Sequence, residues 1–103
     1  MIRNGSDNDI YVTRGGGWSS FYKYSISGNS WSTLAAIPGG DTVYWGSFMI
    51  RNGSDNDIYL TPGNSSTGFY KYSISGNSWT TLTVVPGAVY AGGSMIRNGA
   101  DND

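Results

Sequence analysis

The chain contains two near-identical copies of one sequence. Residues 1–48 and 49–94 align almost throughout, and the segments MIRNGSDNDIY and FYKYSISGNSW are identical in the two copies. The last nine residues, MIRNGADND at 95–103, repeat the start of this sequence a third time. Each unit of such an array leaves an apolar face for its neighbour, and at least three units are usually needed for stability. The repeat therefore constrains both the fold and the assembly.

Short strands account for each period of about 47 residues, a length typical of propeller blades. Asn-Gly, Gly-Asn and Pro-Gly pairs, which favour turns, separate runs of aromatic and β-branched residues. Glutamate and glutamine are absent, and glycine is 16 of 103 residues. We predict an all-β fold of four-stranded antiparallel meanders, arranged as β-propeller blades. The expected strands, in the order a, b, c and d within each blade, are 43–51 and 89–97, 10–14 and 58–61, 21–26 and 69–74, and 31–37 and 79–85.

The middle strands of each repeat carry apolar residues on both faces. Ile10, Tyr11 and Val12 alternate in direction along one strand, as do Phe21 and Tyr22 along the next. A sheet that is apolar on both faces has neighbours on both faces. Stacked blades provide such neighbours.

These segments resemble the kelch repeat. The residues that carry the likeness are IYVTRGG, then FYKYSISGNSW, then the Leu and Pro of LAAIP. The double glycine is intact in the first copy, whereas the second copy has Pro62-Gly63-Asn64. The resemblance implies a propeller whose loops contact ligands. It does not imply the copper chemistry of the kelch enzyme galactose oxidase, which needs the histidine and cysteine that this chain lacks.

Two blades cannot close a ring, so we expect copies of the chain to complete it head to tail. Residues 1–48 form the first blade, with the end of a strand at 1–3, and residues 49–94 form the second. In this hypothesis the partial third repeat, 95–103, is the overlap left where a longer array of repeats was cut or designed. Strand 89–97 completes a blade of the neighbouring chain. A trimer with six blades is favoured over a tetramer with eight. A two-blade fragment lacking its partner chain stays open, as does the question of which end copy is displaced.

Composition removes several classes of function. Cysteine and histidine are absent, which excludes disulfides, thiolate metal sites and the commonest general base. A net charge of −1 offers no basic surface for nucleic acid or an anionic membrane. No apolar run approaches the ~20 residues of a membrane span, and we expect no targeting segment. We expect no enzyme and no cofactor.

Variation between the copies is confined to one rim of the predicted blades. In a meander the loops 14–20 and 62–68 share a rim with the connections 38–46 and 86–92, and these are the segments that differ. Loops on a rigid scaffold commonly bind ligands. An alternative for Tyr44 and Trp45 is that they start a strand and pack between blades. The candidate ligand-binding residues are Arg14, Trp18, Asp41, Tyr44, Trp45 and Tyr90.

The segment NGSDND offers several oxygen atoms, and Asp55 and Asp57 are weak candidates for calcium ligands. The spacing matches no EF-hand loop, and Asp or Asn in a hairpin turn also binds its own backbone. The turn is the favoured interpretation, so no metal site is predicted.

The predicted function is a non-catalytic binding or scaffold module, a kelch-like propeller that assembles itself from short two-blade chains. The alternative is a lectin-like carbohydrate-binding propeller with one weak site per repeat, which would gain avidity from the ring. A glycan or a peptide suits a rim with aromatic residues beside Arg or Asp. A designed or reconstructed propeller without any ligand is a third interpretation of the near-identical repeats.

Overall fold

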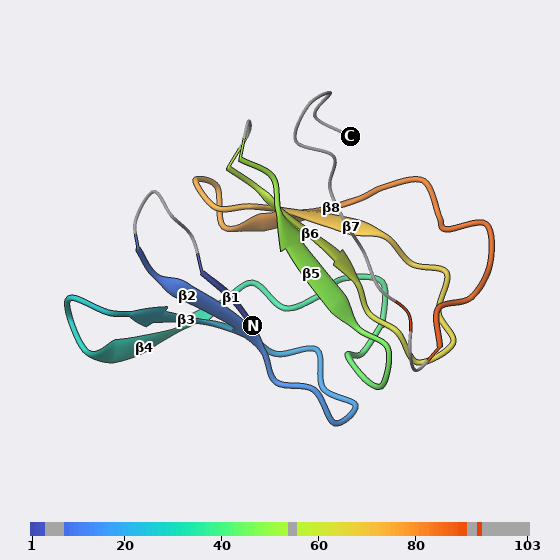
Figure 1. Cartoon of the computed structure of the whole chain (residues 1–103), viewed down its shortest axis with the longest axis horizontal. Coiled ribbons are helices and arrows are strands. Elements are labelled where there is room, and N and C mark those ends of the chain that lie inside the picture. The colour runs from blue at the N-terminus through green and yellow to red at the C-terminus, as the bar shows by residue number, and fades with distance from the viewer. Residues whose placement is uncertain (4–7, 54–55, 91–92, 94–103) are drawn as a thin grey trace.

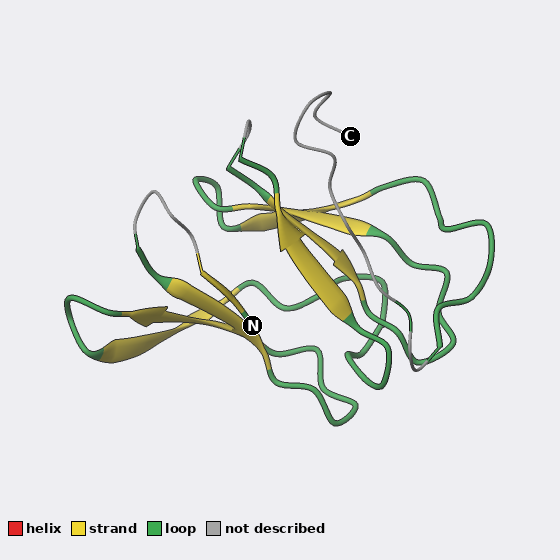
Figure 2. Cartoon of the chain, viewed as in Figure 1, coloured by secondary structure: helices red, strands yellow, loops and turns green. Residues whose placement is uncertain are grey.

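A computed structural model of the chain describes residues 1–3, 8–53, 56–90 and 93. Within these residues there are eight strands in two antiparallel sheets and no helix, which confirms the predicted all-β class (Figures 1 and 2). The described part of the chain accordingly holds no helix long and apolar enough to cross a membrane.

Each sheet is a meander of four strands in chain order. The first sheet contains β1 (Ile2–Arg3), β2 (Ile10–Thr13), β3 (Phe21–Ser25) and β4 (Ser30–Leu34). The second contains β5 (Phe48–Arg51), β6 (Ile58–Thr61), β7 (Tyr70–Ser73) and β8 (Ser78–Thr81). Corresponding pairs share a register: Tyr24 lies opposite Trp31, and Tyr72 lies opposite Trp79.

The turns between the third and fourth strands form where Gly-Asn pairs were expected to place them. The asparagines, not the glycines, take the left-handed conformation, with φ of 48° at Asn29 and 47° at Asn77. Asparagine tolerates this region better than most residues. The Ser25 hydroxyl accepts a hydrogen bond from the Gly28 amide at 3.2 Å, and Ser73 and Gly76 repeat this contact at the same length.

Several strands are shorter than predicted. The strand expected over 43–51 begins only at Phe48, because Gly46 has a φ of 83° and the Ser47 amide turns back to the Tyr44 carbonyl. The strands expected over 31–37 and 79–85 end at Leu34 and Thr81. Beyond Leu34 the backbone bonds instead to other segments. Most of the strand expected over 89–97, and the partial repeat 95–103, lie outside the described residues.

The loop after the second strand of each sheet pairs with the connection that follows the fourth strand. In the first repeat, Trp18 and Val43 form an antiparallel bridge, and the Ile37 amide donates to the Ser19 carbonyl at 2.9 Å. Ser66 and Val89 form the corresponding bridge in the second repeat. These pairings hold the two long loops of each repeat together, at the bottom of Figure 1 for the first repeat and on its right-hand side for the second. They were not predicted.

The core lies between the two sheets. Tyr11 and Phe21 of the first sheet pack against Ile58 and Tyr72 of the second, and all four side chains are buried. The Phe21 and Tyr72 rings meet edge to face, with centroids 4.8 Å apart. The second cluster joins Ile37 and Val43 of the first connection to Leu60 and Tyr70 of the second sheet.

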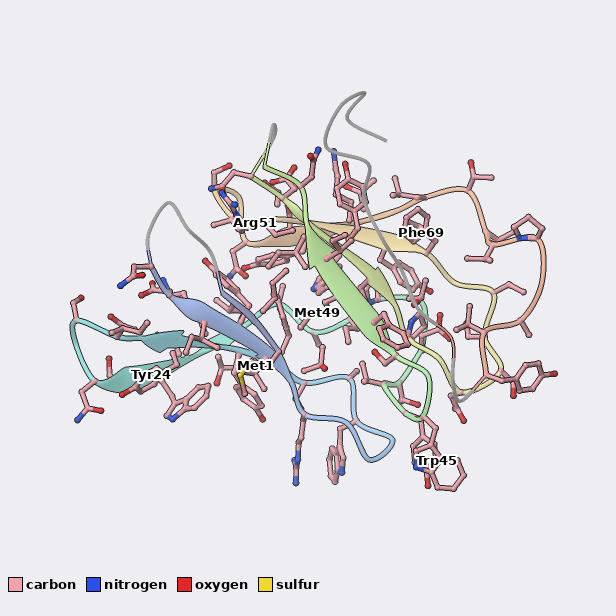
Figure 3. All side chains as sticks on the ribbon, viewed as in Figure 1. Met1, Tyr24, Trp45, Met49, Arg51 and Phe69 are labelled. Atoms are coloured by element: carbon pink, nitrogen blue, oxygen red, sulfur yellow. The ribbon has the colours of Figure 1, made fainter. Side chains whose placement is uncertain are left out.

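Only one face of each sheet is covered by this packing. Phe21 is fully buried, but Phe69, its counterpart in the second repeat, is only partly buried. Tyr24, the counterpart of the buried Tyr72, is likewise only partly buried. Figure 3 shows Tyr24 and Phe69 on opposite sides of the molecule. The neighbours predicted on both faces are therefore present on one face within a single chain.

Candidate functional site

The six candidate binding residues separate into three places. Arg14 and Trp18 form the first, on the loop between β2 and β3. The Arg14 guanidinium carbon lies 4.0 Å from the Trp18 ring centroid, a cation–π contact. Trp18 is 52% exposed, and its amide donates to the Gly15 carbonyl at 3.2 Å. The loop thus presents this pair at the surface.

Asp41 forms the second place, at the junction of the two repeats. Its carboxylate accepts hydrogen bonds from the Ser66 hydroxyl at 3.2 Å and from the Tyr70 hydroxyl. Ser66 in turn accepts from the Gly68 amide at 2.9 Å. Burial, then the hydrogen bond and charge of Asp41, raises the pKa of Tyr70 to about 12. These contacts tie the first connection to the loop between β6 and β7.

Tyr44, Trp45 and Tyr90 meet at the third place, a shallow depression of about 340 Å³. Asn64 and Ser65, which were not among the candidate binding residues, complete its lining. The Tyr44 and Trp45 rings lie 4.9 Å apart and are inclined by 49°. Trp45 is 71% exposed and projects outward from the connection before β5 (Figure 3). This exposure argues against the alternative in which Trp45 packs between the sheets.

The backbone beneath these aromatic residues is fixed. The Tyr44 amide donates to the Pro62 carbonyl at 3.2 Å, and the Asn64 amide donates to the Trp45 carbonyl at 3.0 Å. Gly63 passes so close that a Cβ atom there would lie 2.4 Å from the Trp45 carbonyl oxygen. Contact this close is available only to glycine. The connection of the first repeat and the loop of the second therefore form one rigid unit.

Two further hollows lie on the open faces of the sheets. The hollow on the first sheet, about 420 Å³, includes Val12, Tyr22 and Trp31 among its lining residues. The hollow on the second, about 380 Å³, includes Phe69 and Val85. The sequence placed Val12 and Tyr22 on faces that need a neighbour, but it did not indicate which of the equivalent residues stay open within one chain. Their counterparts Leu60, Tyr70, Trp79, Phe21 and Ile37 pack in the core between the sheets.

The acidic turns are occupied by local partners. Asp57, the calcium candidate within the described residues, lies 3.8 Å from the Lys71 ammonium, and Asp9 lies 3.5 Å from that of Lys23. Arg51 donates from its Nε to the Asn56 side-chain oxygen at 2.8 Å. Asp55, the other candidate, lies outside the described residues. Across the described residues, His, Cys, Asp and Glu form no group of three that could hold a metal ion.

Comparison with known proteins adds no family. No protein-family model and no curated protein matches the chain. The resemblance to kelch repeats consequently stays a prediction carried by the residues themselves.

Proposed function

We propose that this protein is a non-catalytic, kelch-like β-propeller scaffold that assembles head to tail from copies of itself. The carrying observation is the unequal burial of equivalent residues. Trp31 is 60% exposed, whereas Trp79 packs against the core, and Phe69 is partly exposed where Phe21 is fully buried. Each open face thus carries one half of an interface that the chain already forms once.

The contact between the two repeats is the template for the proposed contact between chains. Trp79 donates its indole hydrogen to the Ala35 carbonyl at 2.8 Å, and the Asn77 side-chain oxygen accepts from the Ala35 amide at 3.0 Å. In the proposed assembly, Trp31 and Asn29 bind the backbone of Thr83 in a second copy, because Thr83 occupies the position of Ala35 in its repeat.

Asn29 is already oriented for this role. Its side-chain oxygen accepts a hydrogen bond from the Tyr24 hydroxyl at 2.6 Å, as Asn77 accepts one from Tyr72 at 2.8 Å. The acceptor has the same local geometry on the open face as it has in the covered interface. Such preorganisation lowers the cost of association.

The two open hollows are the apolar counterparts of this contact. Val12 and Tyr22 on the first sheet stand where Leu60 and Tyr70 stand on the second. Val85 stands where the buried Ile37 stands. A head-to-tail contact would bring the two hollows together and cover both, which removes apolar surface from water.

A heterologous contact of this kind closes into a ring when the rotation suits, and two sheets per chain give an even number of blades. We favour three chains and six blades over four chains and eight. In the ring, residues 89–97 of one chain would pair beside β2 of the next. The chain's own β1 covers Tyr11 and Ile10 of β2, whereas β5 covers four residues of β6.

Molar mass in solution tests the proposal directly. Light scattering after size-exclusion chromatography should give three times the 11.0 kDa mass of the chain. Trp31→Ala should shift the mass toward the single chain while circular dichroism still shows the β-sheet. Val84→Ala is the matched control: Val84 is 57% exposed, and its counterpart Ala36 stays exposed in the contact within the chain. A folded wild-type protein that stays at 11.0 kDa at high concentration would overturn the assembly.

A second candidate function is carbohydrate binding on the rim. Trp18, Trp45 and Tyr90 are each more than half exposed on loops that backbone hydrogen bonds hold in place. Exposed aromatic residues on a rigid loop are typical of binding surfaces. A glycan array probed with the wild-type protein tests this candidate, because a lectin-like protein should bind at least one class of glycan on the array.

A further inference from the structure

We infer that the depression lined by Tyr44, Trp45, Asn64, Ser65 and Tyr90 is a binding site for a short neutral saccharide. This inference rests on the second candidate function, carbohydrate binding, and gives it a place and a ligand class. One chain supplies all five lining residues, although Tyr90 also lines the hollow on the second sheet that the proposed assembly would cover.

The lining residues offer the two kinds of contact that a sugar ring requires. Tyr44, Trp45 and Tyr90 supply apolar aromatic surface for the C–H face of a pyranose. Asn64 supplies an amide with two donors and an acceptor, and Ser65 a hydroxyl that donates and accepts, for the sugar hydroxyls. None of the five carries a charge, so the site favours a neutral sugar over an acidic or basic one.

The shape of the site limits the ligand. A volume of about 340 Å³ is at the small end of the range for ligand pockets. The 49° inclination between the Tyr44 and Trp45 rings forms an angled surface that one ring of a saccharide can enter. A saccharide end or a disaccharide fits such a surface better than a long polymer that runs flat across it.

The site is ordered before any ligand arrives. Asn64 and Ser65 have φ angles of 56° and 62°, left-handed conformations that cost energy in residues other than glycine. The backbone bonds from Asn64 to Trp45 and from Tyr44 to Pro62 hold the loop in this form. Strain of this kind tends to gather at functional sites. These two polar residues line the depression beside an aromatic surface that stays open to solvent.

The bridge between Ser66 and Val89 fixes the third aromatic residue. The Val89 amide donates to the Ser66 carbonyl at 2.9 Å, and the Ser65 amide donates to the Val89 carbonyl at 3.0 Å. Tyr90, which follows Val89 directly, is therefore held beside Asn64 and Ser65 although it is 63% exposed. Residues from three separate segments of the chain thus converge on one position.

The test uses the whole chain and an array of neutral mono- and disaccharides of glucose, galactose and mannose, with acidic sugars and short peptides on the same array, followed by titration of the best binder. Wild-type protein should bind, with a change in tryptophan fluorescence as Trp45 becomes covered. Trp45→Ala should weaken binding by at least tenfold, Asn64→Ala should weaken it by less, and Trp45→Phe should restore part of it. Trp18→Ala is the matched control, since Trp18 is an exposed tryptophan on the same rim and lies outside the depression.

The outcomes separate the site from the function. Binding that survives Trp45→Ala and is lost in Trp18→Ala overturns this site while carbohydrate binding stands. A wild-type protein that retains no saccharide overturns both, and selective retention of acidic sugars or of peptides overturns the neutral-saccharide assignment. Circular dichroism and molar mass of each variant must match the wild type, which is expected because Trp45 is 71% exposed.

Discussion

The indole nitrogen of Trp79 donates a 2.8 Å hydrogen bond to the carbonyl oxygen of Ala35, and this contact joins the second sheet to the connection that follows β4 of the first. The same tryptophan packs against Phe21, with ring centroids 5.1 Å apart and ring planes inclined by 58°. One side chain therefore joins the two repeats by both a polar and an apolar contact. Among the ring contacts of the described residues, its counterpart Trp31 contacts only Tyr24, which lies in the same sheet, with ring centroids 5.0 Å apart.

This asymmetry predicts different effects for identical substitutions. Trp79→Ala should lower the free energy of unfolding by about 3 kcal/mol, because it empties a packed position and leaves the Ala35 carbonyl without its donor. Trp31→Ala should cost less than about 1 kcal/mol in the dissociated chain. Urea unfolding of both variants at low protein concentration measures the difference. Equal losses would show that the sheets do not pack as described.

High pH should destabilise the fold through two buried tyrosines. Burial, with Asp41 adding to it at Tyr70, raises the pKa of Tyr70 and of Tyr72 to about 12, above the ordinary value of 10. Their neutral forms thus stabilise the fold fully below pH 10. Between pH 10 and 12 the unfolded chain ionises first, and stability falls by up to about 1.4 kcal/mol per pH unit for each tyrosine.

Thermal unfolding at a series of pH values from 8 to 12 measures this loss. Tyr72→Phe should flatten the decline, although the variant is less stable at pH 8 because Asn77 loses a donor. Tyr90→Phe, which removes the hydroxyl of a side chain that is 63% exposed, is the control substitution. A wild-type protein with constant stability up to pH 12 would contradict the burial of both hydroxyls.

The strands and turns were predictable because they depend on local sequence. Alternation of apolar residues set the middle strands, and Asn29 and Asn77 marked turns that need a left-handed residue. The early strand ends were not predictable. Val43 reads as the start of a strand, yet it bonds to Trp18, a contact that no local pattern encodes.

Some residues of the candidate site were predictable from the sequence, and others were not. Tyr44, Trp45 and Tyr90 stand out as aromatic residues in variable loops, and the structure brings them together. Asn64 and Ser65 read as ordinary turn residues in a chain rich in both types. Asp41 looked like a rim residue, but its carboxylate meets Tyr70, 29 residues further along the chain. Such pairings arise from the packing of the two repeats and leave no signal in either repeat alone.

Asp41 should stabilise the contact between the two repeats. Asp41→Ala removes the acceptor for two hydroxyl groups, those of Ser66 and Tyr70, and should cost about 1–3 kcal/mol. Asp41→Asn keeps one oxygen acceptor and should cost less. In Asp41→Ala the pKa of Tyr70 should fall while staying above its ordinary value, because burial, the larger cause, remains. Ultraviolet titration of the phenol groups and urea unfolding together check both effects, and an unchanged titration curve would count against the contact.

Two glycines with nearly the same backbone conformation give the sharpest comparison. Gly63 and Gly15 occupy equivalent positions in the two repeats, with φ angles of 73° and 72°. A Cβ atom at Gly63 would lie 2.4 Å from the Trp45 carbonyl oxygen and 2.6 Å from the Ser47 amide nitrogen, both backbone atoms. At Gly15 such an atom would meet nothing within 4 Å. Left-handed strain is therefore the same at the two sites, and only the close approach differs.

Gly15→Ala should cost about 1 kcal/mol in the dissociated chain, the usual penalty for a left-handed alanine. Gly63→Ala should cost at least about 2 kcal/mol more, because the connection that carries Trp45 must move away. In the proposed assembly Gly15 takes the place of Gly63 at the contact between chains, so Gly15→Ala should also weaken association when light scattering is repeated over a dilution series. If Gly15→Ala leaves the molar mass unchanged while Gly63→Ala unfolds the chain, the in-chain contact stands and its repetition between chains does not.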